Sequence, residues 1–311
     1  MNIKSLGLFF KNIENIRILL YLLFVAIIVI MFRNYQLLHS EHHSPHPSIY
    51  RHELDLKPHY NGHYWTFQPN QSIEGQIIRK NKVSQKYLVN IDENGFRKTP
   101  DIQNPKKGAV LFFGGSFDFG KGLNDDETLP WLISTATKRK TYNAAVYGMG
   151  LQNMIMSLKD PSFYEKVPNT EVIIYSFMPW HMDNIKNKDY GKVSLHNDEL
   201  LVSPPGVDND NVRMGRDKVE KTFYLLMIES HHLARKNYPN SRFVLIYPGG
   251  CISPFVLKKL NDDNIETVNL DKLLLEPFEQ PKFQIKGDPK HFPNAYIWKE
   301  LTPYLVYRLN L

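Results

Sequence analysis

Five short apolar runs, separated by helical patterns, constrain the fold of this 311-residue chain most strongly. Short continuous runs of this kind are typical of strands that are buried on both faces of a sheet. The runs are Ala109–Phe113, Tyr142–Val146, Val172–Tyr175, Phe243–Tyr247 and Ile265–Val268. Helical apolar spacing lies between them at Leu129–Lys138, Met154–Leu158 and Lys218–Lys236. Strands that alternate with helices predict an α/β domain whose mainly parallel sheet is covered on both faces.

A small β segment is expected to lead into this alternation. From about Tyr60 the chain reads HYWTFQPN, and further on QKYLVNIDENGFR, with the aromatic and β-branched residues that strands favour. The dipeptide Asn94–Gly95 is typical of a tight hairpin turn. We therefore assign residues 60–311 to one folded domain that begins with short strands.

The N-terminal region contains one uncharged apolar run, Ile18–Phe32, between Arg17 and Arg33. Its 15 residues are fewer than a spanning helix usually has, but flanking arginines can snorkel to the membrane interface. No small-residue cleavage site follows the run, which favours an uncleaved anchor over a signal peptide. The alternative is a buried core helix. The sequence predicts that residues 1–33 are a cytoplasmic N-terminus and a transmembrane anchor.

Charges and composition around the anchor predict a topology. Lys4, Lys11 and Arg17 precede the run, so the positive-inside rule places the N-terminus in the cytoplasm. The C-terminal domain of this single-pass membrane protein is then periplasmic or extracellular. Residues 34–59 are predicted to be a juxtamembrane linker rich in His, Pro and Ser. The histidine spacing matches no defined ligand set, so we predict no metal site.

Charge and cysteine content narrow the function classes. The net charge is +6, and residues 1–33 carry about half of it. No block of Lys and Arg occurs in the rest, which argues against a nucleic-acid partner. Cys251 is the only cysteine, so no intramolecular disulfide forms, and a lone cysteine is usually a small buried hydrophobe.

In a parallel sheet, sites form outside the carboxyl ends of the strands. The first such loop reads GGSFDFGKG, with Ser116 after two glycines. It is either a nucleophile turn or a glycine turn with a serine helix cap. Asp118 takes the place of the last glycine of the G-x-S-x-G elbow, and no phosphate-loop lysine follows. The acidic cluster Asp125, Asp126 and Glu127 is expected to be a solvated face near a helix start.

Two further segments carry candidate chemistry. Asn143 and Gly148 bracket the end of the second strand, where Gly148 could direct a backbone N–H toward Ser116 or merely form a turn. Near the C-terminus, Asp288 and His291 are two residues apart. At this spacing a carboxylate can hold one imidazole nitrogen while the other faces a cleft.

Together these segments resemble the SGNH/GDSL hydrolase superfamily over roughly Asn90 to the C-terminus. In that family a G-D-S segment carries the nucleophile, N-x-x-x-x-G an oxyanion glycine, G-x-N-D an oxyanion asparagine, and D-x-x-H the rest of the triad. Here Ser116 matches the nucleophile, Gly148 the glycine, and Asp288 and His291 the D-x-x-H pair. NIDENGFR resembles the N-x-x-G-F-R segment of many bacterial members. The resemblance implies a flavodoxin-like three-layer fold with about five parallel strands.

Two positions depart from the family pattern. Gly115 replaces the aspartate of G-D-S, and the loop after the third strand reads SFMPWHMDN without the expected asparagine. His181 or Asn184 could supply the missing donor, or the oxyanion hole has only the backbone N–H groups of Ser116 and Gly148. Losing one oxyanion donor costs about 10²–10³ in rate, so the departure bears directly on activity.

The resemblance implies a membrane-anchored serine esterase or O-acyltransferase that needs no metal or organic cofactor. Ser116 would be the nucleophile, His291 the general base and Asp288 its orienting carboxylate. Its substrate would bear an ester on envelope carbohydrate, with acetyl groups foremost, or on lipid, and a membrane acyltransferase is a candidate partner. The alternative is a catalytically degenerate binding or assembly module of the cell envelope. A nucleotide-binding domain is disfavoured, because both glycine fingerprints are missing.

Overall fold

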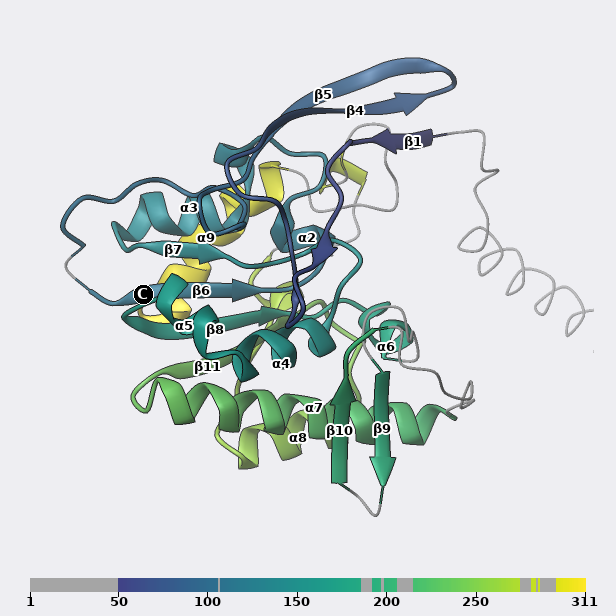
Figure 1. The fold of residues 1–311 in the computed structure, drawn as a ribbon, viewed down its shortest axis with the longest axis vertical. Helices are drawn as coiled ribbons and strands as arrows, with labels where there is room; N and C mark the ends of the chain where they lie inside the picture. The colour runs from purple at the N-terminus through teal and green to yellow at the C-terminus, as the bar shows by residue number, and fades with distance from the viewer. Residues whose placement is uncertain are drawn as a thin grey trace, which may run out of the picture. The chain divides into compact units, whose positions relative to one another are not determined.

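A five-stranded parallel sheet forms the centre of the structure, which is a computed structural model (Figure 1). Its spatial order is β12-β11-β8-β6-β7, and every neighbouring pair is parallel. Numbered along the chain within this sheet, the order is 2-1-3-4-5, which is the flavodoxin-like arrangement. The strands are β6 (Ala109–Phe113), β7 (Thr141–Asn143), β8 (Thr170–Ser176), β11 (Arg242–Tyr247) and β12 (Glu266–Asn269). The predicted α/β class and the five parallel strands are confirmed.

The structure describes residues 50–105, 107–185, 192–196, 199–205, 215–274, 281–283, 285 and 295–311. The predicted anchor at residues 18–32 and the pair Asp288 and His291 lie outside these ranges. Within the described ranges, no helix combines the length and the apolar character that crossing a membrane requires.

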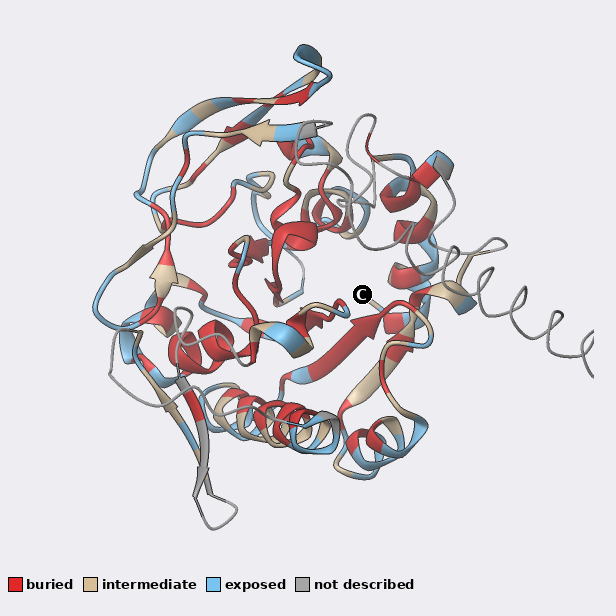
Figure 2. Ribbon diagram, turned by 90° about the vertical axis from the view of Figure 1, so that its right-hand side faces the viewer, coloured by how far each residue is buried: buried red, intermediate tan, exposed pale blue. Residues whose placement is uncertain are grey.

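Helices cover the sheet on both sides and bury two separate cores (Figures 1 and 2). Alternate residues of β6 explain the division: Val110 and Phe112 face one core, and Leu111 and Phe113 face the other. The first core also receives α3 (Leu129–Thr137) and α9 (Ala295–Leu309). The second is covered by α4 (Leu151–Lys159), α5 (Pro161–Lys166), α7 (Arg216–Asn237) and α8 (Pro254–Asp262). The result is three layers, as the family resemblance implies.

Some elements differ from the sequence expectation. β7 ends at Asn143, whereas the apolar run continues to Val146. The neighbouring strand β6 itself ends at Phe113, so the run has no strand to pair with beyond that point. Ala144 and Val146 still donate backbone hydrogen bonds, at 3.0 and 3.2 Å, to Phe112 at the end of β6 and to Gly114 in the loop. The antiparallel hairpin of β9 (Lys192–His196) and β10 (Glu199–Ser203) follows β8 without having been predicted.

The β segment before the main sheet has one long hairpin, β4 (Ser72–Arg79) and β5 (Lys82–Asn90). It turns at Lys80 and Asn81, whose φ angles of 48° and 60° fit a two-residue type I′ turn. The expected turn at Asn94–Gly95 closes only an isolated bridge between Ile91 and Arg97. β1 (Tyr50–Glu53) pairs with β4, so the folded unit begins at Tyr50, inside the segment predicted to be linker. β2 (His59–Tyr60) and β3 (Trp65–Thr66) form a separate pair.

Candidate active site

The candidate site lies where the strand order of the sheet reverses. The chain leaves β6 for β7 on one side and later returns to form β8 on the other side of β6. β6 and β8 are paired, with Phe113 opposite Tyr175, so the loops that follow them leave the same edge of the sheet. Open α/β sheets bind their ligands in the crevice at such a point. The loop after β6 carries Ser116, and the loop after β8 carries His181 and Asn184.

Ser116 is the first residue of α2 (Ser116–Phe119), a single helical turn. Ser116 is 8% exposed, whereas Asp118 two residues later is fully buried. Of the two polar side chains in this turn, that of Ser116 is therefore the one that can meet a substrate. Gly120 ends α2 in the left-handed region at φ 76°, a conformation that glycine adopts without steric cost. The chain therefore places Ser116 at a sharp strand-to-helix turn on the carboxyl edge of the sheet.

Asn143 ties α2 to the neighbouring strand. Its side-chain Nδ2 donates to the backbone oxygen of Asp118 at 2.7 Å, and its Oδ1 accepts from the N–H of Ala145 at 3.3 Å. Its own carbonyl accepts from the N–H of Arg97 at 3.2 Å. Asn143 is fully buried, so these bonds fix the position of α2 against the end of β7.

Gly148 lies in the loop between β7 and α4, with φ at 82°. Only glycine adopts this angle readily, so the backbone requires it at this position. The carbonyl of Gly148 accepts a hydrogen bond from Nδ2 of Asn184 at 3.2 Å. One of the two candidate side-chain donors is therefore engaged in holding the Gly148 loop.

His181 begins α6 (His181–Asn184) and is 2% exposed. Its Nδ1 lies 2.8 Å from the hydroxyl of Tyr175 and 3.3 Å from the backbone nitrogen of Met178. A backbone N–H can only donate, so Nδ1 is the accepting nitrogen and the ring proton of the neutral imidazole is on Nε2. Burial lowers the pKa of His181 to about 3, so the ring is neutral near pH 7.

Gly115 and His181, which both stand at departures from the family pattern, are in contact. A Cβ on Gly115 would lie 2.7 Å from Nε2 of His181 and 3.2 Å from the carbonyl oxygen of Met149. No real Cβ approaches a neighbour at the first of these distances, so residue 115 cannot carry a side chain while the imidazole keeps its place. The φ of Gly115 is −101°, which other residues also adopt, so space and not backbone freedom requires this glycine.

Asp118 is a buried carboxyl in the same helical turn as the candidate nucleophile. The hydroxyl of Ser176 donates to its Oδ1, while Oδ2 has no hydrogen-bond partner in the described part of the chain. Burial raises the pKa of Asp118 to about 7, and the bond from Ser176 opposes that rise. Its place in the loop is the only sign of this group in the sequence, because its hydrogen-bond partner, Ser176, comes from β8.

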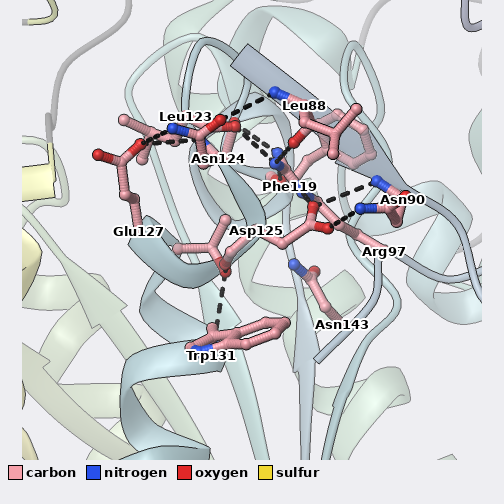
Figure 3. A network of polar contacts seen from close by, with 12 residues as sticks. Leu88, Asn90, Arg97, Phe119, Leu123, Asn124, Asp125, Glu127, Trp131 and Asn143 are labelled. Carbon is pink, nitrogen blue, oxygen red and sulfur yellow. Dashed lines mark hydrogen bonds and ion pairs between the residues drawn. The ribbon is translucent and has the colours of Figure 1, made fainter. Parts of the chain in front are cut away.

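Arg97 holds the opposite end of α2 (Figure 3). It is fully buried, and all five of its N–H groups donate. Nη1 donates to the carbonyls of Phe119 and Gly120 at 2.7 and 2.6 Å, and Nη2 donates to those of Leu88 and Leu123 at 3.3 and 2.6 Å. Nε donates to Oδ1 of Asp125 at 2.9 Å.

The acceptor of that ion pair, Asp125, corrects one expectation from the sequence. It is buried, and it also accepts from the backbone N–H and from Nδ2 of Asn90 at 3.2 and 2.6 Å. The acidic cluster is therefore not wholly solvated, although Asp126 is exposed as expected. Arg97, noted in the sequence only as part of a family-like segment, joins the β4–β5 hairpin to the loop of Ser116.

The described residues contain no group of three or more His, Cys, Asp or Glu side chains that could hold a metal ion. A cavity of about 760 Å³ lies at the other edge of the sheet. It is lined by residues at the starts of the strands, among them Gly108, Thr170 and Ser241. It therefore lies away from the carboxyl ends where Ser116 and His181 meet.

Comparison with known proteins gives structural neighbours only. No protein-family model matches the chain, and no curated protein matches it in sequence. The solved structures that it is similar to include an acetyl xylan esterase from Butyrivibrio proteoclasticus, at 14% identity and a TM-score of 0.44, covering 69% of this chain and 67% of that one. Another is a putative lipolytic protein of the G-D-S-L family from Desulfitobacterium hafniense. Its identity to this chain is 13% and its TM-score 0.43, and the match covers 65% of this chain and 99% of that one.

A further neighbour is a carbohydrate esterase whose active site is described as displaying divergent catalytic and non-catalytic binding functions. It gives 12% identity and a TM-score of 0.44, covering 85% of this chain and 98% of that one.

Proposed function

We propose that this chain is a serine esterase or O-acyltransferase that acts on ester-bearing carbohydrate, with Ser116 as its nucleophile. The observation that carries the proposal is the position of Ser116. It opens a short helix at the switch point of a flavodoxin-like sheet, next to a glycine and a neutral buried histidine. Such turns present a hydroxyl together with backbone N–H groups at a helix N-terminus, which suits an acyl-transfer centre.

The proposed reaction has two half-reactions. Oγ of Ser116 attacks the ester carbonyl while His291 accepts its proton, and His291 then protonates the leaving alcohol. Asp288 orients the imidazole and stabilises its protonated form. The N–H groups of Ser116 and Gly148 bind the developing oxyanion. Water releases the acyl group in an esterase, and a second alcohol accepts it in a transferase.

Substrate and location follow from the sequence resemblance and the predicted anchor. A domain held at the outer face of a membrane would meet acetylated envelope carbohydrate, and lipid esters are the next class. A membrane acyltransferase could supply acyl groups to such a domain. The carbohydrate esterases among the structural neighbours motivate acetylated glycans as the first substrates to test.

Labelling with a fluorophosphonate tests the nucleophile directly. We expect the wild-type chain to be labelled and the Ser116→Ala variant to remain unlabelled, with acetate release from acetylated glycans lost in parallel. Ser157→Ala is the matched control, because Ser157 is also buried but donates only to the carbonyl of Asn153 within α4. Its labelling should equal that of the wild type.

Two outcomes would redirect the proposal. A folded wild-type chain without Ser116-dependent labelling or turnover would point to the binding or assembly module. Turnover that rises when an acceptor alcohol is added, with acyl product on the acceptor, would identify the transferase over the hydrolase.

A further inference from the structure

The space beside Ser116 is occupied by an imidazole edge. Nε2 of His181 faces the Cα of Gly115, and Gly115 shares a peptide bond with Ser116. Trp180, the preceding residue, packs on Phe117 of α2 with ring centroids 4.9 Å apart. The loop after β8 is thereby packed on the turn that carries Ser116, and His181 keeps a fixed position relative to the N–H of Ser116.

The ring is oriented by two hydrogen bonds at its far side. The N–H of Met178 requires Nδ1 to accept, and the hydroxyl of Tyr175 can donate to the same atom. Both fix the neutral tautomer that carries hydrogen on Nε2. In the described part of the chain, Nε2 has no hydrogen-bond partner, so the only N–H of this buried ring points toward the Gly115–Ser116 turn.

The other candidate donor lies at the Gly148 loop and uses one of its two N–H groups there. Nδ2 of Asn184 donates to the carbonyl of Gly148, which holds the neighbouring loop. Asn184 is therefore a residue that positions Gly148, and the choice between the two candidates falls on His181.

We propose that Nε2–H of His181 is the side-chain donor of the oxyanion hole, and that residue 115 is glycine because the imidazole occupies the space of a side chain. The inference rests on the proposed function, since an oxyanion forms only if Ser116 attacks an ester. The two departures from the family pattern are then coupled. His181 places a larger donor side chain in one loop, and position 115 in the other loop is glycine because a side chain there would clash with the imidazole.

His181 transfers no proton in this scheme. The bond between Ser116 Oγ and the carbonyl carbon forms, the carbonyl π electrons move to oxygen, and the serine proton goes to His291. Three N–H groups, those of Ser116, Gly148 and His181, then face the oxygen anion. A neutral donor suits this task, because it strengthens its hydrogen bond as charge develops and keeps its own proton.

Two substitutions at His181 and one at Tyr175 test the donor. His181→Leu fills the site without an N–H, and we expect it to lower kcat about 10²–10³-fold with KM changed little. His181→Gln places an amide N–H near the position of Nε2, and it should retain kcat within about tenfold. Tyr175→Phe removes one of the two bonds to Nδ1 but leaves that of Met178, and should cost only a few-fold. Thermal unfolding of each variant verifies that it is folded.

A double-mutant cycle tests the link to Gly115. Gly115→Ala should lower kcat in the wild type by about 10²-fold, because its methyl group displaces the imidazole. In the His181→Ala background the imidazole is gone and only the 3.2 Å approach to the Met149 carbonyl remains, so the same change should cost less than about threefold further. This non-additivity depends on the contact between the two residues and does not require either single variant to be as stable as the wild type.

The outcomes separate the two proposals. A wild type that is labelled and active, with His181→Leu as active as the wild type, overturns the donor role alone. Equal losses in the Leu and Gln variants would mean that an N–H at this position does not restore activity, and they overturn it as well. A folded wild type with no Ser116-dependent labelling or turnover overturns the proposed function and the donor role with it.

Discussion

The two ends of α2 rest on two buried polar clusters that differ in how completely their hydrogen bonds are made. At the C-terminal end, Arg97 uses all five donors, and both oxygens of Asp125 accept (Figure 3). At the N-terminal end, Asp118 has a carboxyl oxygen with no partner in the described residues, and His181 directs an N–H toward Gly115.

This contrast separates two roles for buried polar groups. A fully paired cluster stabilises one arrangement of the backbone and has nothing left to offer a ligand. Incompletely paired groups cost free energy in folding, and they concentrate where a protein handles a substrate. The Arg97–Asp125 cluster thus supports the turn that carries Ser116. We expect a substrate to bind at the other end of α2, beside His181 and Asp118.

The largest expected effect on stability comes from the fully paired cluster. Arg97→Met would leave Asp125 as an unpaired buried carboxylate and free four carbonyl oxygens, so unfolding free energy should fall by about 3–5 kcal/mol. Urea unfolding measures the change. Arg51→Ala is the control, since its ion pair with Glu53 is exposed and should matter by less than about 1 kcal/mol. Equal losses in both variants would contradict the distinction drawn here.

Asp118 should make stability depend on pH in the opposite sense to a carboxylate whose pKa is lowered by folding. Its pKa is raised to about 7 in the folded chain, against roughly 4 when unfolded. The folded state therefore holds the proton longer, and stability falls as the pH rises through the range from about 4 to 7. Asp118→Asn removes this titration. The difference in unfolding free energy, variant minus wild type, should grow by up to about 4 kcal/mol across that range and then level off. A difference that is flat with pH would refute the assignment.

Ser176→Ala should have a smaller effect on the same group. Ser176 donates to Asp118 and favours its ionised form, so removing the hydroxyl raises the pKa of Asp118 further. The fall in stability should then extend to higher pH, with a loss of about 1–3 kcal/mol at pH 8. The pH series of urea unfolding used for Asp118 gives the measurement, and Ser157→Ala, remote from Asp118, should leave its midpoint unchanged.

Gly148→Ala should have the smallest effect on stability but a clear one on activity. The φ of 82° would cost an alanine about 1–2 kcal/mol. Its backbone N–H would shift with the strain, so ester turnover should fall more than stability does. Gly62→Ala, also at positive φ but on an exposed loop, is the control that should lose stability and keep turnover. Turnover equal to wild type in Gly148→Ala would remove this residue from the oxyanion hole.

The sequence predicted those parts of the molecule that depend on local pattern. β6 matches its apolar run residue for residue, because all five side chains are buried between the two helical layers. Ser116 could be found because the end of a buried strand and two glycines mark a sharp turn at the edge where sites form. The hairpin turn at Lys80–Asn81 was missed, since neither residue is the glycine that such turns usually contain.

Other parts depend on contacts between distant segments, which a local pattern does not contain. Asp125 looked like a surface acid until its partner, 28 residues earlier in the chain, was brought to it by the β segment. The choice between His181 and Asn184 could not be made from their loop either, because it depends on which of them meets Gly115 and which meets Gly148.

The hydrogen bonds of Arg97 have a consequence for which side chains around the turn can change in evolution. Four of its five bonds end on main-chain oxygens, so the side chains of Phe119, Leu123 and Leu88 take no part in those bonds. Changes of these side chains leave the acceptors of the guanidinium in place, whereas position 120 is held to glycine by its φ of 76°. A single guanidinium would thereby keep the Ser116 hydroxyl in register while the side chains along its acceptor segments change.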